Sequence, residues 1–140
     1  MKILLAVDGS EHTKRMLAYL AAHTELIGPV GSYTAITVVP ALPPHVTRFV
    51  PSDVERGHYE EQAEAVLKPV RVFAAQQGWN LEAKKVIGHA GDAIAELAEA
   101  GKYDLLVMGS HGHGAVAGML LGSVVSRVIA QCRTPVLLIR

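Results

Sequence analysis

Residues 109–123 read Gly109-Ser-His-Gly112-His-Gly114-Ala-Val-Ala-Gly118-Met-Leu-Leu-Gly122-Ser123. An apolar run, Tyr103 to Met108, precedes them and a helical pattern, Ser123 to Ala130, follows, so they join a strand to a helix. Glycines at such a connection allow positive φ angles and close approach of a ligand to the main chain. Unpaired N–H groups at the start of the next helix favour an anion. Glycine richness also suits a flexible surface loop, but the position between strand and helix favours a phosphate-binding cradle.

The chain on either side of this loop alternates strands with helices. Five segments are predicted to be strands, and all but the third are largely apolar: Lys2–Val7, Tyr33–Val39, Leu81–Ile87, Asp104–Met108 and Val136–Ile139. Charged residues mark the third of these strands as an edge. Alternation of this kind predicts right-handed crossovers and a three-layer α/β domain with a parallel sheet. Ligands of such folds bind beyond the carboxyl ends of the strands, where Asp8 and Gly109 would meet if their strands are neighbours.

Helix boundaries are predicted from capping residues and breakers. Ser10 is expected to cap a helix that stops before Gly28-Pro29, and Asp92 to cap a short helix that ends at Gly101. Ser52-Asp-Val-Glu55 is a capping box that opens a long helix ending near Gly78, in which Pro69 should cause a kink or local break. The prolines between 40 and 51 predict a loop.

Length and composition limit the possible classes. The sequence has 140 residues, the size of one domain spanning 1–140, with 13 acidic and 13 basic residues. A zero formal charge argues against a nucleic-acid surface. Cys132 is the only cysteine, which excludes an intrachain disulfide and a thiolate metal cluster. Without a signal-peptide core or an unbroken apolar span, we expect a cytoplasmic protein that does not bind membranes.

Several nucleotide-site and phosphoacceptor motifs do not fit. There is no Gly-x-x-x-x-Gly-Lys-Ser/Thr sequence, and the first strand-to-helix turn, Asp8-Gly9-Ser10, is too poor in glycine for a dinucleotide fingerprint. A phosphoacceptor receiver domain would need paired acids where this chain has Asp8 alone. His111 and His113 are weak support for zinc without a nearby carboxylate or thiolate. Asp8 alone could also be an ordinary helix-flanking cap.

The spacing Gly109, two residues, Gly112, nine residues, Gly122-Ser123 resembles the nucleotide-binding signature of the universal stress protein family. The opening strand with Asp8-Gly9-Ser10 and the ending from Gly122 to Arg140 are also similar to that family. The resemblance covers the whole chain and is least typical at 40–52. It implies a Rossmann-like, five-stranded parallel sheet in the order 3-2-1-4-5, a homodimer, and membership of the ATP-binding branch.

The resemblance also implies residue roles. Asp8 and the backbone of Val38 would hold adenine, whereas Ala6, Val7 and Gly109 would line the ribose. Gly112, Gly122, Ser123 and Val124 would give amides to the phosphates, which could carry Mg²⁺ or Mn²⁺. Met108 and His111, on either side of Gly109, complete the candidate site. His113 is a departure, because many relatives have Arg or Lys there and histidine is mostly neutral at pH 7.

The expected function is an ATP-binding regulatory or stress-survival module. No strong general base or Arg finger is evident, so we expect slow ATP hydrolysis at most and no catalytic residues. Two alternatives stay open: an adenine-nucleotide hydrolase-like enzyme, which would need catalytic residues such as Arg48, Asp53 or Glu55, and a nucleotide-free interaction scaffold. The apolar strand Val136–Ile139, at an unprotected sheet edge, predicts a homodimer through that strand.

Overall fold

The fold is organised around a parallel sheet with the strand order β3-β2-β1-β4-β5. A computed structural model describes residues 1–27, 31–113 and 117–140. The strands are β1 (Lys2–Ala6), β2 (Ser32–Val39), β3 (Leu81–Ile87), β4 (Leu105–Gly109) and β5 (Val136–Ile139). The helices are α1 (Glu11–Ala22), α2 (Thr24–Ile27), α3 (Pro44–Thr47), α4 (Ser52–Gln76), α5 (Ala90–Ala100) and α6 (Ser123–Gln131). The strand order and the parallel pairing confirm the predicted sheet.

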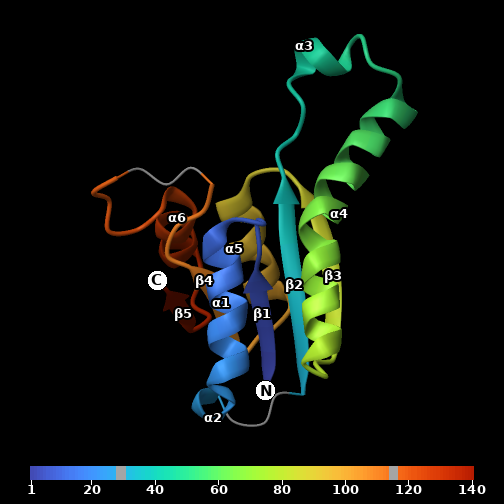
Figure 1. Cartoon of the computed structure of the whole chain (residues 1–140). Coiled ribbons are helices and arrows are strands. Elements are labelled where there is room, and N and C mark those ends of the chain that lie inside the picture. Colours follow the sequence, from blue (N-terminus) through green and yellow to red (C-terminus); the bar gives the residue numbers. More distant parts are fainter. Residues whose placement is uncertain (28–30, 114–116) are drawn as a thin grey trace.

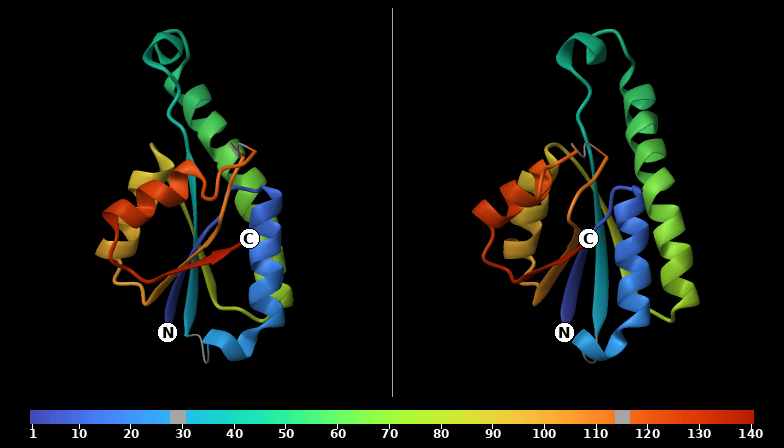
Figure 2. Two further views of the ribbon diagram at one scale, coloured as in Figure 1. Left: turned by 90° about the vertical axis from the view of Figure 1, so that its left-hand side faces the viewer. Right: turned by 60° about the vertical axis from the view of Figure 1, so that its left-hand side comes forward.

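Helices cover both faces of this sheet. In Figure 2, α1 and α4 lie on one face and α5 and α6 on the other. Successive side chains of β1 pack on opposite faces of the sheet, because side chains alternate along a strand. Ile3 and Leu5 pack with α1 and α4, whereas Leu4 packs with α5 and α6, and all three are fully buried. Burial on both faces explains why this strand is a continuous apolar run.

The two edge strands differ in charge. β3 carries Glu82, Lys84 and Lys85, and Lys85 forms an ion pair with Glu60 of α4. The prediction that β3 is an edge strand is therefore confirmed. β5 lies at the other edge and presents no charge from Val136 to Ile139, although most of its side chains are only partly buried. One edge of the sheet is thus charged and the other apolar.

The start of α1 differs from the predicted cap. Ser10 precedes the helix, but its side chain makes no capping hydrogen bond. Its N–H donates to Asp8 Oδ1 at 2.9 Å, so Asp8 organises this turn. α1 ends at Ala22 and is followed by the short α2. The predicted stop at Gly28-Pro29 lies outside the described residues.

Two further predicted side-chain caps are wrong, although α4 begins at Ser52, where the capping box was predicted to open it. The box Ser52–Glu55 makes no side-chain cap, because the Glu55 carboxylate accepts a hydrogen bond from the Tyr59 hydroxyl. α5 begins before Asp92, which therefore lies inside its first turn and pairs with Arg127 of α6 at 2.7 Å. In both places the acidic side chain bonds another side chain instead of the local backbone, within α4 for Glu55 and across to α6 for Asp92.

The long helix α4 continues through Pro69, so the predicted local break is wrong. Pro69 and Ala65 are both exposed, and water can satisfy the Ala65 carbonyl that loses its N–H partner. Beyond the carboxyl end of β2, the chain forms a projection made of α3 and the first turns of α4 (Figure 1). The prediction of a loop throughout 40–51 is wrong at Pro44–Thr47, which form the one-turn helix α3, but α3 has no buried residue and is not part of the core. None of the helices in the described ranges combines the length and apolarity needed to cross a bilayer.

Candidate functional site

A cavity of about 580 Å³ opens beyond the carboxyl ends of β1, β2 and β4. Its volume is in the range of roughly 300–1,000 Å³ that is usual for small-molecule sites. It lies at the point where the strand order reverses, which is where open α/β sheets bind ligands. The predicted site residues all line this one cavity: Ala6, Val7, Asp8, Val38, Met108, Gly109, His111, Gly112, Gly122, Ser123 and Val124. The structure therefore brings them together, while their individual roles stay predictions.

Because β1 ends before it reaches Val38 of β2, the main chain of Val38 is exposed to this cavity. β1 pairs with β2 only as far as Ala6 opposite Ile36, and the Val7 N–H then donates to the Ile36 carbonyl at 3.0 Å. In a parallel sheet, alternate residues turn their N–H and C=O groups toward opposite neighbours. Val38 therefore turns its backbone groups to the same side as Ile36, where β1 no longer runs. Within the described residues they have no strand partner, and a planar ligand could take one there.

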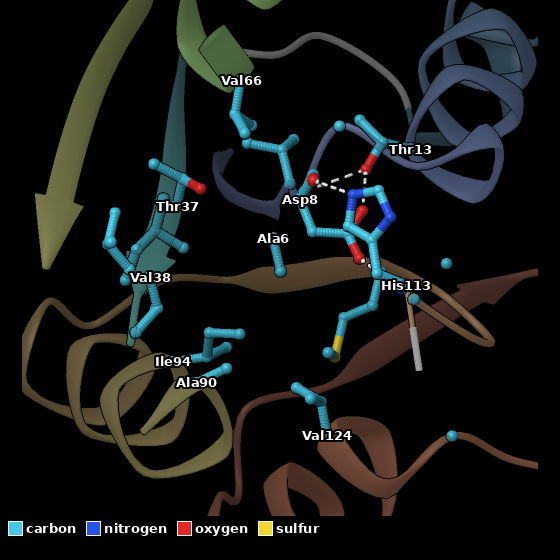
Figure 3. A pocket seen from close by; sticks show the side chains of 18 of the residues that line it. Ala6, Asp8, Thr13, Thr37, Val38, Val66, Ala90, Ile94, His113 and Val124 are labelled. Atoms are coloured by element: carbon cyan, nitrogen blue, oxygen red, sulfur yellow. Dashed lines mark hydrogen bonds between the residues drawn. The ribbon is translucent and has the colours of Figure 1, made fainter. Parts of the chain in front are cut away.

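Apolar side chains form a slot next to Val38. Figure 3 shows Val38, Ala90, Ile94 and Val66 around one end of the cavity, contributed by β2, α5 and α4. Ala65, Val39 and Pro40 also line it. A flat aromatic ring can be buried between such aliphatic walls, and main-chain groups at its edge can fix its orientation.

Asp8 connects the end of β1 to the glycine loop. Its Oδ1 accepts hydrogen bonds from the Ser10 N–H and the Thr13 hydroxyl, each at 2.9 Å, and its Oδ2 accepts the His113 N–H at 3.2 Å (Figure 3). Burial alone would raise the pKa of Asp8, but these hydrogen bonds and the nearby His113 more than offset it and lower the pKa. Asp8 is thus a carboxylate at neutral pH, with both oxygens already in use. A predicted contact with adenine would need one of its remaining lone pairs.

Gly112 allows the loop to close over Asp8. A Cβ built on Gly112 would overlap Asp8 Oδ2, the atom that accepts the neighbouring His113 N–H. Any side chain at position 112 would separate the loop from the carboxylate. Bare backbone is therefore required there by a protein atom, whatever the cavity binds. Glycine at position 112 had instead been predicted to leave room for a phosphate.

The start of α6 supplies amides to the other end of the cavity. Gly122 is the residue before the helix, and its N–H donates to the Ser110 carbonyl at 2.9 Å, so in this conformation it is not available to a phosphate. The amides of Ser123 and Val124 belong to the first turn, where helical N–H groups have no partner within the helix. Both residues line the cavity, and the positive end of the α6 dipole points into it.

Two histidines of the glycine loop also line the cavity. The His111 Nε2 bonds to the Met119 carbonyl at 2.9 Å, and its Nδ1 lies 3.2 Å from the Ser110 hydroxyl. The His113 Nε2 bonds to the Asp8 carbonyl at 2.7 Å, which makes this nitrogen a donor. His12 of α1 is only partly exposed, and its ring lies 5.5 Å from that of His111. Gly114 lies outside the described residues.

Sequence reasoning missed several cavity residues, among them Thr13, Thr37 and Gln62. Thr37, like Thr34, is a buried polar residue of β2, a signal that could have been used. Gln62 lies on the polar face of α4 and carries no such signal. None of Arg48, Asp53 and Glu55, which a hydrolase would need, lines the cavity. In the ranges that the structure describes, no group of three or more His, Cys, Asp or Glu side chains could hold a metal ion.

Comparisons with a family model and with curated proteins indicate the same family. The model of the universal stress protein family matches residues 1–140. A universal stress protein of Thermus aquaticus is 34% identical over 143 residues, covering 99% of this chain and 97% of that protein. One of Synechocystis sp. is 30% identical over 139 residues, covering 99% of this chain but 42% of that protein. The chain thus spans less than half the length of the Synechocystis relative.

Solved structures share this architecture. A hypothetical protein whose biochemical function was assigned from its structure has a TM-score of 0.79 at 24% identity and covers 99% of this chain and 94% of its own. A universal stress protein in complex with cAMP has a TM-score of 0.64 at 26% identity, covering 100% and 96%. One from Archaeoglobus fulgidus in complex with dAMP has a TM-score of 0.69 at 22% identity, covering 100% and 98%.

Proposed function

Since this chain belongs to the universal stress protein family, we propose that it binds ATP in the cavity between β1 and β4 and acts as a regulatory or stress-survival module. One observation carries the proposal: a single cavity has an apolar slot with unpaired main-chain groups at one end and first-turn helix amides at the other. A base, a sugar and a phosphate chain need these surroundings in that order. The relative in complex with cAMP supports an adenine nucleotide.

The Val38 backbone would read the base. Adenine presents an N6 amino donor beside the N1 acceptor, and the Val38 C=O and N–H complement this pair. Guanine presents an acceptor beside a donor on the same edge, so both contacts would be unfavourable. Leaving a buried polar group unpaired costs about 1–3 kcal/mol. The site should therefore reject GTP.

The phosphates would meet amides of the glycine loop and of α6. Gly112, Ser123 and Val124 offer main-chain N–H groups, and the exposed Ser123 can add its hydroxyl. A Mg²⁺ or Mn²⁺ ion would be held chiefly by the phosphates themselves, as is common for nucleotide-bound Mg²⁺. With Asp8 engaged by the loop and α1, we expect hydrolysis to be slow at most.

We also propose a homodimer through β5. This strand is an apolar edge, and antiparallel pairing with the same strand of a second copy across a two-fold axis would cover it. Val136 and Leu138 would then pack across the junction.

A competition experiment tests the nucleotide proposal. Calorimetry with ATP, GTP and adenosine should show ATP bound at least about 5-fold tighter than GTP, since one mismatched group alone costs about 1 kcal/mol or more. Adenosine should compete with ATP, because it keeps the base contacts. Equal affinity for ATP and GTP would show that the Val38 backbone does not contact the base. Mass spectrometry of small molecules released on denaturation should identify an adenine nucleotide, and a nucleotide-free scaffold would neither release nor bind one.

A further inference from the structure

The charge balance of the cavity is unusual for a site that would hold a polyphosphate. Among the described residues that line it, the ionisable ones are Asp8, His111 and His113, with no Lys or Arg. Arg127 borders a neighbouring hollow at the start of α6, but it is paired with Asp92 at 2.7 Å. The side chains of the cavity therefore offer a phosphate chain no permanent positive charge, and one of them is a carboxylate. Any cationic contact from a side chain of the cavity must come from a histidine that has taken up a proton.

We infer that His113 is the phosphate-binding cation of this site and that its ring takes up a proton when the nucleotide binds. The inference rests on the proposed function. His113 is exposed, follows Gly112 directly, and anchors its ring through the Nε2 donor to the Asp8 carbonyl. That bond leaves Nδ1 as the position for an added proton. In the described part of the chain, no protein group occupies Nδ1.

The described cavity residues around His113 include one anion and no permanent cation. Asp8, at the end of β1, places its carboxylate beside the ring and accepts the His113 N–H. A phosphate bound at Gly112 and Ser123 would add a second anion on the cavity side. The residues that α4 and α6 contribute to the cavity lining carry no charge. An anion close to an imidazole stabilises the imidazolium, so binding and protonation should reinforce each other.

His111 is less suited to this role. Both of its ring nitrogens already have partners, the Met119 carbonyl and the Ser110 hydroxyl. Its ring also lies 5.5 Å from that of His12 on α1, whose Nδ1 is buried without a hydrogen-bond partner in the described chain. A second positive charge there would repel any charge on His12. His111 is therefore better explained as the residue that holds the loop to Met119.

The test compares the parent with His113→Gln at pH 6 and pH 8. The Gln amide can still donate to the Asp8 carbonyl but takes up no proton. The ratio of ATP affinities, parent over variant, should rise severalfold from pH 8 to pH 6, since only the parent can gain a positive charge beside the phosphates. The ATP terminal phosphate also titrates near pH 6, but this effect is common to both proteins and leaves the ratio unchanged.

Three controls and one further measurement keep the outcomes distinct. Adenosine, which has no phosphate, should bind parent and variant with the same pH dependence. His45→Gln, on the exposed α3 outside the cavity, should behave as the parent. His113→Arg should restore tight ATP binding and remove the pH dependence. Calorimetry in two buffers of different ionisation enthalpy should show more proton uptake on ATP binding in the parent than in His113→Gln. A constant ratio at the two pH values would overturn the role of His113, whereas failure of both ATP and adenosine to bind would instead refute the proposed function.

Discussion

Gly112→Ala tests how closely the glycine loop depends on Asp8. The added Cβ would lie well inside the 3.0 Å limit from Asp8 Oδ2, below which one of the two groups must move. The movement would break the hydrogen bond from the His113 N–H to Oδ2, now 3.2 Å long. A hydrogen bond to a charged group contributes about 1.5–3 kcal/mol, equivalent to roughly 10- to 150-fold in affinity. We therefore expect ATP to bind at least tenfold more weakly, with a smaller effect on adenosine.

A double-mutant cycle identifies the responsible contact. In an Asp8→Ala background the clash partner is absent, so Gly112→Ala should then have little further effect on calorimetric ATP affinity. Thermal unfolding of each variant checks that the fold persists. Gly57→Ala is a matched control, because its Cβ would meet no atom within 4 Å and it lies in α4 away from the cavity. If Gly112→Ala binds ATP like the parent, or if its effect is the same without the Asp8 carboxylate, the reasoning is refuted.

Two further predictions concern the sheet edge and acid stability. Light scattering at micromolar concentration should give a dimer mass for the parent, and monomer or insoluble protein for Leu138→Asp; a parent mass near the 14.9 kDa of one chain would contradict the β5 interface. Because the folded-state pKa of Asp8 is lowered, its contribution to stability is present above about pH 4 and is lost as the pH falls further. Asp8→Asn should therefore show a smaller loss of melting temperature between pH 5 and 3, and parallel curves would show that Asp8 does not contribute.

The sheet and the location of the cavity were predictable for a physical reason. A strand with both faces buried needs a continuous apolar run, and such runs are visible in the sequence at β1 and β4. The residues that follow parallel strands meet at one end of the sheet, so Asp8 and Gly109 could be placed together. The strand order itself came from the family resemblance, because alternation of strands and helices does not specify it.

Contacts between distant side chains could not be predicted in the same way. Asp8 and His113 are separated by 105 positions, and no local pattern indicates that one oxygen of Asp8 accepts the His113 N–H. Asp92 was predicted to cap α5 because capping is the local option for an aspartate. In the folded protein Arg127 of α6 is within reach, and this tertiary contact replaces the local one. The reason for glycine at position 112 was missed because it too depends on a distant residue, Asp8.

The early end of β1 has a consequence for how this site could be altered. If Val38 reads the base through its main chain, alanine scanning would miss it, because every amino acid except proline carries the same N–H and C=O groups. Base preference would then be encoded in strand register and not in side-chain identity. An insertion or deletion of one residue in β2 would turn the neighbouring peptide toward the cavity. Backbone chemistry, such as an amide-to-ester replacement at this residue, would be the direct way to reveal it.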